Sequence, residues 1–501
     1  MLNLFFFFVF SFLLYPVIVS QYAIAQSYHY EISKYFKYQF KIKIIVSVIC
    51  LIIYTISFFV NGIVKILLLF LQMAIIYIFL FRIIPFKLTN RVKRFFLCVF
   101  SINSLIYFLP FNKLDLLLCL ETFILFFIFM SHLLSSFIEF NIINYYASQA
   151  KEIIKDVKII GITGSYGKTS CKNIIFDMLE GTFNVSKTPK SYNNKVGIVK
   201  SIRECVNEGD DYFICEYGVD KKAAMDKLID IARPNVALIS EIGPQHLLTF
   251  KSIENIKNEK LKLVKCLNEN EWAIINNDNQ YLNEEIQYLK CNVLTYGIKN
   301  NSRVMAKDIK MTCNGSSFDL YVDDKFISTI KISLLGEHNI LNVLGAISVL
   351  ITLNIDLKDI KKLTLRIKPT EHRLQLKKME NIKVIDDSFN SNEVGFKNAI
   401  DVLALMKEEK IVITPGIIEQ GDNSAYVNYK LGRYMASKVD KVILVEKNAS
   451  IIEKGLLVEN FKKDKIIIKK NFAEAWEYVK ETSDDEKIYL IENDLPSIYL
   501  K

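Results

Sequence analysis

The distribution of charge divides this 501-residue chain near residue 150, and that division constrains the fold more than any other feature. Residues 1–150 hold eleven Lys and Arg and only four Asp and Glu, whereas the remaining residues hold 52 and 50. A segment this poor in charge has too little polar surface to fold as a soluble domain. We therefore predict an N-terminal α-helical transmembrane domain over 1–150, followed by α/β domains.

Five apolar stretches in this first domain come close to the roughly 20 residues that a helix needs to cross a bilayer. Asn61-Gly62 and Lys65 separate the second stretch from the third. Glu121 lies near the outer end of the fifth stretch. An acid inside the membrane is a candidate functional residue, but near an end of the span we expect its carboxylate to reach toward the interface. A cleaved signal peptide is a competing interpretation of the first stretch, although a basic n-region is missing before Ala23-Ile-Ala25. The five predicted spans are 4–25, 44–64, 66–81, 95–112 and 116–138.

The basic residues of this domain predict its orientation. Four lysines at 34–43 follow the first stretch and five basic residues at 82–94 follow the third, whereas the other two connections carry only Lys65 and Lys113. Basic loops stay in the cytoplasm. We therefore expect a multi-pass protein of the cell membrane, surrounded by membrane lipids, with its N-terminus outside and residues 139–501 in the cytoplasm.

The rest of the chain is almost neutral, which gives no indication of a nucleic-acid partner. Its cysteines contain no Cys-x-x-Cys pair, so reduced thiols are a better interpretation than a disulfide framework or a zinc site. These observations favour a cytoplasmic enzyme or a nucleotide-binding module over a secreted or nucleic-acid-binding protein.

From residue 152 short β-branched runs alternate with helical stretches such as 252–267, a pattern typical of layers around a parallel sheet. Residues 301–334 instead alternate polar and apolar side chains, which predicts a small antiparallel insert, and 339–364 is predicted to be helical. We predict a central P-loop ATPase domain with a parallel sheet over 151–367 and a Rossmann-like α/β domain over 368–501. The predicted strands are 157–160, 212–215, 236–240, 272–275 and 293–296, then 383–385, 411–413, 442–445 and 488–491.

Residues 161–170 read Gly-Ile-Thr-Gly-Ser-Tyr-Gly-Lys-Thr-Ser and connect a predicted strand to a predicted helix. A glycine-rich turn at a helix N-terminus exposes backbone N–H groups that bind phosphate. Lys168 can reach the β- and γ-phosphates, and the hydroxyl of Thr169 can ligate Mg²⁺. The glycines, Gly164 and Gly167, depart from the usual spacing of a phosphate loop. The structural alternative is a glycine turn that carries a surface lysine.

This loop, with the form Thr-Gly-x-x-Gly-Lys-Thr, resembles the ATP loop of the Mur ligase family, which joins amino acids to carboxylates. The resemblance covers about residues 152–501 and is closest to the branch that adds D-alanyl-D-alanine, whose last motif also begins Asp-Asp-Ser. The further stretches that resemble family motifs in the same order are Ser191–Gly197, Glu216–Gly218, Ile242–His246, Lys260, Ile275–Asp278, Gly336–Asn342, His372–Gln375 and Asp386–Asn392.

The resemblance implies an ATP-dependent ligase of the Mur type that works through an acyl phosphate. A carboxylate has no good leaving group, and transfer of the γ-phosphate of ATP supplies one that an amine can displace. Such a transfer needs positioning and charge neutralisation more than a nucleophilic side chain. The residues implied for ATP binding are Gly164, Ser165, Gly167, Lys168, Thr169, Ser170, Asn276, Asn339, Arg373 and Asp387.

Four residues are implied for catalysis: Lys168, Glu216, His246 and Lys260. Glu216 and His246 each follow a predicted strand, and ligands bind at strand ends of this kind in open α/β sheets. The resemblance further implies two Mg²⁺ sites, held by Thr169, Glu216, His246 and Lys260, the last as a carbamate formed with CO₂. An exposed helix face is the alternative for Lys260, and Phe250-x-Ser252 upstream sets its alignment against the neighbouring lysines.

Two departures from the family pattern leave the substrates open. The N-terminal domain that binds the uridine nucleotide in the soluble enzymes is replaced by apolar stretches, and the last domain carries Thr414–Gly421 and Glu492–Pro496 where a Lys-Gly-Ser type motif is usual. The donor is expected to be an amino acid or a dipeptide. The carboxylate acceptor is expected in a peptidoglycan-like envelope precursor, and a lipid-linked form is plausible.

Other functions remain open at this stage. A related ligase could extend a capsule or poly-amino-acid polymer, and a different class would be a nucleotide-gated membrane protein or an inactive scaffold. Runs of intramembrane charge and paired broken helices are missing from the apolar stretches, which disfavours a transporter.

Overall fold

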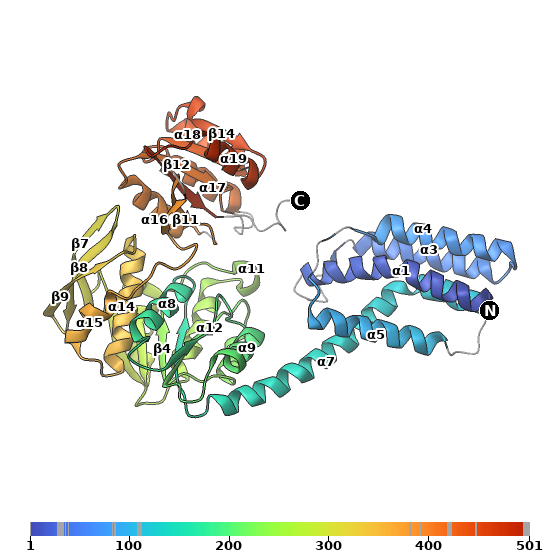
Figure 1. Ribbon diagram of the computed structural model, residues 1–501, viewed down its shortest axis with the longest axis horizontal. Helices are drawn as coiled ribbons and strands as arrows, with labels where there is room; N and C mark the ends of the chain where they lie inside the picture. Colours follow the sequence, from blue (N-terminus) through green and yellow to red (C-terminus); the bar gives the residue numbers. More distant parts are fainter. Residues whose placement is uncertain are drawn as a thin grey trace. The chain divides into compact units, whose positions relative to one another are not determined.

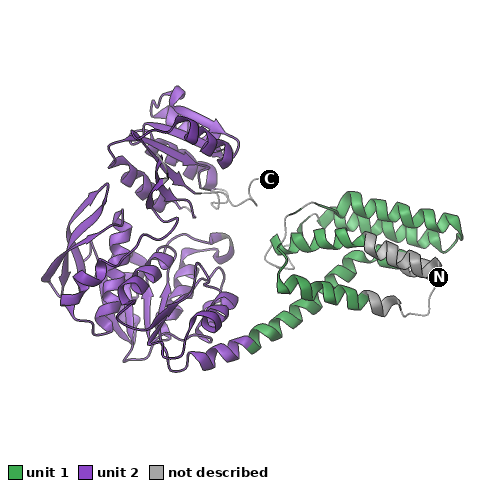
Figure 2. Cartoon of the chain, viewed as in Figure 1, with its two compact units in different colours: residues 1–145 green, residues 146–501 purple. Residues whose placement is uncertain are grey.

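The protein forms two compact units, Met1–Tyr145 and Tyr146–Lys501 (Figures 1 and 2). A computed structural model describes residues 2–27, 35, 37–38, 40–82, 84, 87–107, 113–379, 382–389, 392–417, 423–445 and 448–493. Parts of the predicted basic connection at 34–43, of the predicted fourth span and of the motifs at 414–421 and 492–496 lie outside these residues.

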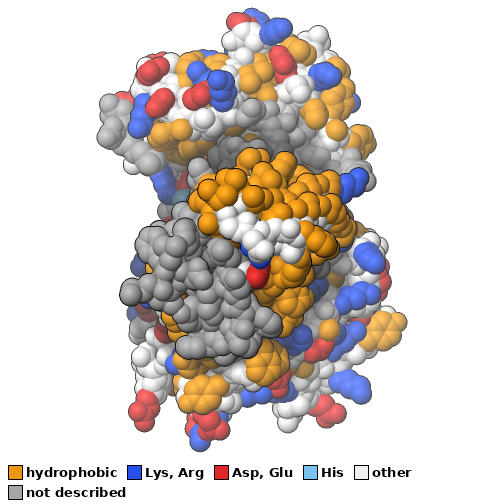
Figure 3. Space-filling view, turned by 90° about the vertical axis from the view of Figure 1, so that its right-hand side faces the viewer, with side chains coloured by type: hydrophobic (Ala, Val, Ile, Leu, Met, Phe, Trp, Pro, Cys, Tyr) orange, Lys and Arg blue, Asp and Glu red, His pale blue; other side chains and the backbone are white. Residues whose placement is uncertain are grey.

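The first unit is helical, and three of its described helices, α3, α4 and α7, are long and apolar enough to cross a membrane. Large apolar side chains are exposed along these helices, including Phe59, Ile63 and Phe137. Figure 3 shows the broad apolar surface that results. Such a surface is costly in water and suits a lipid environment. The helices are α1 (Leu2–Ser27), α3 (Phe40–Ser57), α4 (Ile63–Leu80), α5 (Asn90–Tyr107), α6 (Lys113–Thr122) and α7 (Ile124–Ile153), which continues into the second unit.

Several boundaries of the predicted spans are wrong. Lys65 does not separate two spans but lies inside α4, where it pairs with Asp115 of α6. The predicted span 116–138 is divided between α6 and α7 at Phe123. The fourth stretch belongs to α5, which begins at Asn90 and includes three basic residues near its start. Sequence windows could not foresee that Lys65 pairs with Asp115 and Arg94 with Glu139, because each of these partners lies on another helix.

The expectation for Glu121 is also wrong. Its side chain does not reach out from the helical unit but is fully buried, with 0% of its surface exposed. Two other acidic residues of the unit are paired, Asp115 with Lys65 and Glu139 with Arg94.

The second unit contains a nine-stranded sheet in the order β2-β3-β1-β4-β5-β6-β7-β8-β9. Strands β1 to β6 are parallel, and β7 joins β6 in parallel before the antiparallel pairs β7–β8 and β8–β9. The strands are β1 (Lys158–Thr163), β2 (Val185–Lys187), β3 (Tyr212–Glu216), β4 (Val236–Ile239), β5 (Trp272–Asn276), β6 (Asn292–Gly297), β7 (Val304–Thr312), β8 (Gly315–Val322) and β9 (Lys325–Ile332).

Helices cover both faces of the parallel part of this sheet. Successive side chains of a strand point to opposite faces, so Ile160 and Ile162 of β1 enter the core that contains α8 and α14, whereas Ile159 enters the core that contains the end of α7. The helices are α8 (Lys168–Leu179), α9 (Lys195–Cys205), α10 (Met225–Ile229), α11 (Leu247–Phe250), α12 (Ile253–Lys265), α13 (Gln280–Asn283), η1 (Ile286–Tyr288), α14 (Glu337–Thr352) and α15 (Leu357–Thr364).

A six-stranded sheet follows in the order β10-β11-β15-β12-β13-β14, parallel except for the edge strand β10. Its strands are β10 (Gln375–Met379), β11 (Ile382–Asp387), β12 (Glu409–Thr414), β13 (Lys441–Val445), β14 (Ile466–Lys469) and β15 (Lys487–Glu492). Its helices are α16 (Glu393–Ala404), α17 (Ser424–Met435), α18 (Ala449–Val458), η4 (Lys463–Lys465) and α19 (Phe472–Thr482).

All nine predicted strands are present, and 301–334 is antiparallel as predicted. The predicted helical stretch 339–364 consists of two helices, α14 and α15, because the chain turns at Leu353–Asp356. Strands β2, β10 and β14 were not predicted. The α/β prediction is thereby confirmed for residues 158–492.

Candidate functional site

The pairing of strands brings the sequence motifs to one edge of the nine-stranded sheet. Strand β1 lies between β3 and β4, with Ile162 opposite Glu216 and Thr163 opposite Ile239. The strands are parallel, so the turn after β1, the end of β3 and the segment after β4 lie together. Chain connections diverge on either side of β1, and a ligand crevice is expected at such a point.

The two glycines of the turn after β1 are required by close contacts. A side chain on Gly164 would lie 2.1 Å from Oγ of Ser240. Gly167 has a φ of +77° directly before α8, and a side chain there would lie 2.6 Å from Oδ1 of Asn342. The hydroxyl of Ser165 donates to the carbonyl of Gly243 at 2.9 Å. The turn is therefore held between the segment after β4 and helix α14, with the N-terminus of α8 at its end.

Two lysines converge on this turn. Nζ of Lys168 and Nζ of Lys260 donate to the same carbonyl, that of Gly164, at 2.7 and 2.8 Å. Burial and the charge of Lys168 hold the pKa of Lys260 well below its usual value, and burial lowers the pKa of Lys168 to about 8. The neighbouring Lys257 and Lys262 instead form ion pairs with acidic residues of α12 and of other segments. Only Lys260 of these three helix lysines is placed at the turn.

Glu216 is the buried acidic residue of the site, with 1% of its surface exposed. It accepts hydrogen bonds from the hydroxyl of Thr169 at 3.1 Å, from Nζ of Lys172 at 3.0 Å and from Nδ2 of Asn193 at 2.9 Å. Burial opposes its ionisation, but the charges of Lys172 and Lys168 outweigh burial and hold the pKa of Glu216 below its usual value. The site therefore contains an ionised carboxylate beside the hydroxyl of Thr169.

These two oxygens fit a magnesium ion. Octahedral Mg²⁺ binds oxygens at about 2.0–2.1 Å, which puts neighbouring ligands about 3 Å apart, and Oγ1 of Thr169 lies 3.1 Å from Oε2 of Glu216. Among the described residues no group of three or more His, Cys, Asp or Glu side chains could hold a metal. An ion at this place would therefore take further oxygens from phosphate or water, as Mg²⁺ commonly does.

The other predicted residues of this sheet lie around the same edge. His246 has an exposed side chain and a φ of +54° directly before α11. Nδ2 of Asn276 donates to the carbonyl of Ser240 at 2.9 Å, and Asn339 accepts from Asn342 at 3.2 Å. Ser170 lies in the first turn of α8 with 8% of its surface exposed.

Arg373 and Asp387 belong to the region of the six-stranded sheet. Burial lowers the pKa of Arg373, opposed by the charges of Asp387 and Glu216, and the guanidinium lies 4.2 Å from the ring centre of Phe389. Burial raises the pKa of Asp387 to about 6, while Arg373 acts in the opposite direction. Arg373 is thus close enough to Glu216 and Lys168 to act on both.

The sequence analysis gave no role to Lys172 or Asn193, although both hold Glu216. Lys172 is buried. Its spacing could have identified it, since it follows Lys168 by four residues and therefore lies on the same face of α8. Asn193 lies in the stretch Ser191–Gly197 that resembles a family motif, but its contact with Glu216 depends on the pairing of β2 with β3.

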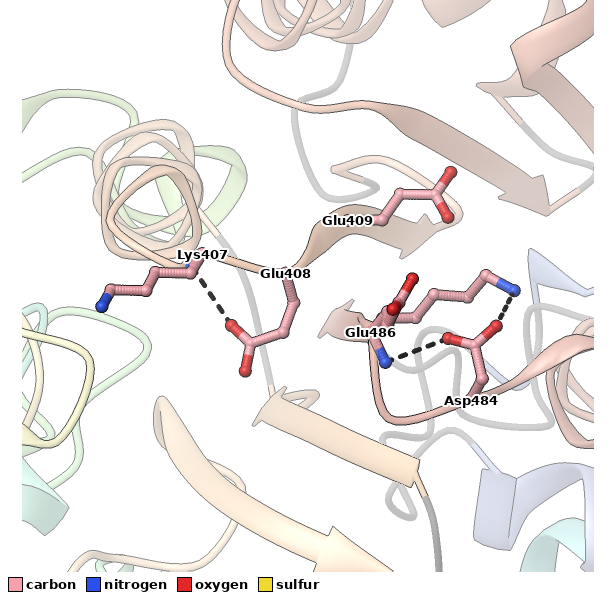
Figure 4. A pocket seen from close by; sticks show the side chains of 6 residues that line it. Lys407, Glu408, Glu409, Asp484 and Glu486 are labelled. Atoms are coloured by element: carbon pink, nitrogen blue, oxygen red, sulfur yellow. Dashed lines mark hydrogen bonds and ion pairs between the residues drawn. The ribbon is translucent and has the colours of Figure 1, made fainter.

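A groove of about 470 Å³ lies elsewhere, at the amino-terminal ends of β12 and β15 (Figure 4). Its charged residues hydrogen-bond within the protein, as in Lys487 with Asp484 and Lys383 with Glu408. It is lined by Lys407, Glu408, Glu409, Asp484, Glu486 and Lys487. We regard this groove as solvated surface, because the predicted residues lie at the opposite ends of the strands.

Known proteins match the part of the chain that contains the two sheets. Residues 162–350 match the Mur ligase middle domain and residues 372–491 match the glutamate ligase domain of Mur ligases. The chain is 30% identical over 292 residues to the UDP-N-acetylmuramoyl-tripeptide--D-alanyl-D-alanine ligase of Buchnera aphidicola, a match that covers 58% of this chain and 63% of that protein. It is 28% identical over 313 residues to the enzyme of that name from Bacillus subtilis, covering 62% of this chain and 67% of that protein.

A solved structure has the same fold. The MurF ligase of Thermotoga maritima, determined in complex with ADP, superimposes with a TM-score of 0.61 and 23% identity, covering 70% of this chain and 80% of that one. The resemblance inferred from ordered motifs is thereby confirmed for the middle and C-terminal domains.

Proposed function

Because the chain belongs to the Mur ligase family over residues 162–491, we propose that it is an ATP-dependent carboxylate–amine ligase. In this proposal the γ-phosphate of ATP activates a carboxylate as an acyl phosphate, and an amine displaces phosphate to form an amide. The names of the relatives support this class of reaction. The chain matches only 63% of the Buchnera enzyme, so the activity is assigned to the residues of the site and not to the whole relative.

The observation that carries the proposal is an excess of positive charge around the turn after β1. Nζ of Lys172 pairs with Glu216, and Lys168, which donates to the carbonyl of Gly164 in the turn, acts electrostatically on the same carboxylate. Arg373 acts on the same group from the six-stranded sheet. Uncompensated buried charge is unstable, and a nucleotide phosphate would supply the missing negative charge. The N-terminus of α8 favours the same ligand.

The roles of the residues follow from their positions. Gly164, Ser165, Gly167, Lys168, Thr169 and Ser170 would hold the phosphates, with Thr169 and Glu216 as ligands of Mg²⁺, which neutralises phosphate charge when bound. Asn276, Asn339, Arg373 and Asp387 would contact the nucleotide, and His246 would serve the second metal site. Burial and the charge of Lys168 hold the pKa of Lys260 well below its usual value, which favours the neutral amine, the form that can add CO₂ as a carbamate.

We propose that the donor is a dipeptide such as D-alanyl-D-alanine and that the acceptor is a muramoyl-peptide carboxylate, from the names of the relatives. The apolar first unit suggests that this acceptor is lipid-linked and is used at the inner face of the membrane. The five predicted spans would then cross the bilayer, and helices α3, α4 and α7 are long and apolar enough to do so.

Cysteine labelling tests this location. Lys41→Cys should be shielded in intact cells from a membrane-impermeant maleimide, and Lys113→Cys should react. The opposite pattern would contradict a cytoplasmic ligase domain. Permeabilised cells, in which both positions should react, provide the control.

The reaction itself can be tested with the full chain in lipid nanodiscs. We expect ADP and an amide product only when ATP, Mg²⁺, D-alanyl-D-alanine and a muramoyl-tripeptide acceptor are all present, with faster turnover for the lipid-linked acceptor than for the uridine nucleotide form. ATP hydrolysis at the same rate with and without the donor and every acceptor would contradict the proposal.

A further inference from the structure

The interior of the helical unit contains a carboxyl group that the ligase reaction does not use. Glu121, at the end of α6, has 0% of its surface exposed, and neither of its carboxyl oxygens has a hydrogen-bond partner among the described residues. Glu139 provides the contrast. It is also buried, at 7% exposure, but Nε of Arg94 lies 2.5 Å from its carboxylate.

Polar groups of three helices meet beside Glu121. Nε2 of Gln72 in α4 donates to the hydroxyl of Thr122 at 2.7 Å, and that hydroxyl lies 3.4 Å from the carbonyl of Cys50 in α3. Glu121 is close enough to act electrostatically on the thiol of Cys50. Glu121, Thr122, Gln72 and Cys50 therefore form one cluster between α3, α4 and α6.

This cluster has more acceptors than donors. Oε1 of Gln72, whose surface is also 0% exposed, has no hydrogen-bond partner in the described part of the chain. Together with the two oxygens of Glu121 it makes three buried acceptor atoms without a donor. A flip of the Gln72 amide would not supply a donor without a loss, because its Nε2 already donates to the hydroxyl of Thr122 and to the carbonyl of Leu118.

Leaving a carboxylate unpaired in such a place is strongly unfavourable, because an apolar interior solvates charge poorly. One positive charge beside Glu121 removes the cost. A proton lets the carboxyl group donate a hydrogen bond, and an alkali ion would be coordinated by the carboxylate and by the amide oxygen of Gln72. Either cation neutralises the carboxylate.

We propose that Glu121, Gln72 and Thr122 form a binding site for one small monovalent cation, a proton or an alkali ion, in the interior of the helical unit. The site is independent of the ATP-binding turn. It links α6 to α4, so occupancy by the cation holds these helices together.

A hydrophobic carbodiimide tests the site in the full chain, reconstituted in lipid vesicles in alkali-free choline buffer. The reagent adds to a protonated carboxyl group, whose proton moves to a carbodiimide nitrogen, and the adduct rearranges to a stable N-acylurea without a leaving group. We expect the adduct at Glu121 and not at Glu139, as read by mass spectrometry of the peptides. Glu121→Gln should lose the adduct from its peptide.

Added NaCl distinguishes the two cations. Loss of labelling in NaCl, at equal ionic strength of choline chloride, assigns an alkali ion, and unchanged labelling assigns a proton. Gln72→Leu should weaken protection by Na⁺ in the first case. Labelling of Glu139 as strongly as Glu121, or no labelling of Glu121 in choline buffer, would overturn the proposal.

Discussion

Replacing Lys172 by Met tests whether the ion pair with Glu216 holds the site together. Met keeps most of the length of the side chain and removes its charge. Both partners are 1% exposed and their charged atoms are 3.0 Å apart. Removing one partner of a buried pair costs about 3–5 kcal/mol, because the other charge stays buried without compensation. Glu216 keeps its hydrogen bonds from Thr169 and Asn193. We therefore expect the free energy of unfolding to fall by an amount near the lower end of this range, about 3 kcal/mol.

A double-mutant cycle separates the pair from the loss of packing. Lys172→Met with Glu216→Gln removes both charges and should recover most of the stability, giving a coupling energy of about 2 kcal/mol. The two tryptophans make the assay specific. In a Trp476→Phe background the fluorescence of Trp272, in β5, reports urea unfolding of the nine-stranded sheet.

Lys200→Met is the matched control. Its pair with Glu204 on α9 has side chains 49% and 62% exposed, at 3.7 Å, and an exposed pair of this kind contributes about 0.3–0.5 kcal/mol. The argument for a buried, coupled pair is refuted if Lys172→Met lowers the free energy of unfolding no more than Lys200→Met does. It is also refuted if the stability losses from the changes at Lys172 and Glu216 are additive.

Three further predictions concern single residues. Lys168→Ala should abolish ATP turnover with either Mg²⁺ or Mn²⁺ while the circular dichroism spectrum is unchanged, and a normal rate would mean that the turn after β1 does not bind phosphate. Lys260→Ala should lower ligase activity on the order of 10³-fold or more, as expected for loss of a metal ligand, and added acetate should restore part of it. Lys262→Ala should leave the activity nearly unchanged. Full activity of Lys260→Ala would exclude a catalytic carbamate. Burial and the charge of Arg373 lower the pKa of His338 to about 4, so the folded state binds fewer protons than the unfolded state between about pH 4 and 6.5. The wild type should therefore lose about 3 kcal/mol relative to His338→Gln as the pH falls through this window, and urea midpoints whose difference does not change with pH would contradict it.

The sequence predicted the strands well where apolar β-branched residues form continuous runs, as in β4 and β13. It missed β10, Gln375–Met379, because two lysines interrupt it and its position depends on antiparallel pairing with β11. Strand β14 was missed although it contains three consecutive isoleucines; it lies at the edge of the sheet, where its side chains are only partly buried. Local sequence cannot supply such pairings, which form between distant segments.

The same limit applies to side chains. The motifs predicted Glu216 and Lys168, because these residues occur at the ends of predicted elements, whereas Lys260 lies inside a predicted helix and was given only by the resemblance. They could not predict that Lys168 and Lys260, 92 positions apart in the sequence, share one carbonyl, or that Glu121 is buried. Each of these facts depends on how separate helices and strands pack.

The fate of oxygen in the activated carboxylate tests the central claim most directly. The full chain in nanodiscs would be given ATP, Mg²⁺, D-alanyl-D-alanine and a muramoyl-tripeptide whose terminal carboxylate carries ¹⁸O. If an acyl phosphate forms, one carboxylate oxygen leaves with the phosphate, so each inorganic phosphate released should carry a single ¹⁸O from a doubly labelled carboxylate, and Lys168→Ala should release none. Amide product accompanied by unlabelled phosphate, or phosphate release without amide, would contradict the account.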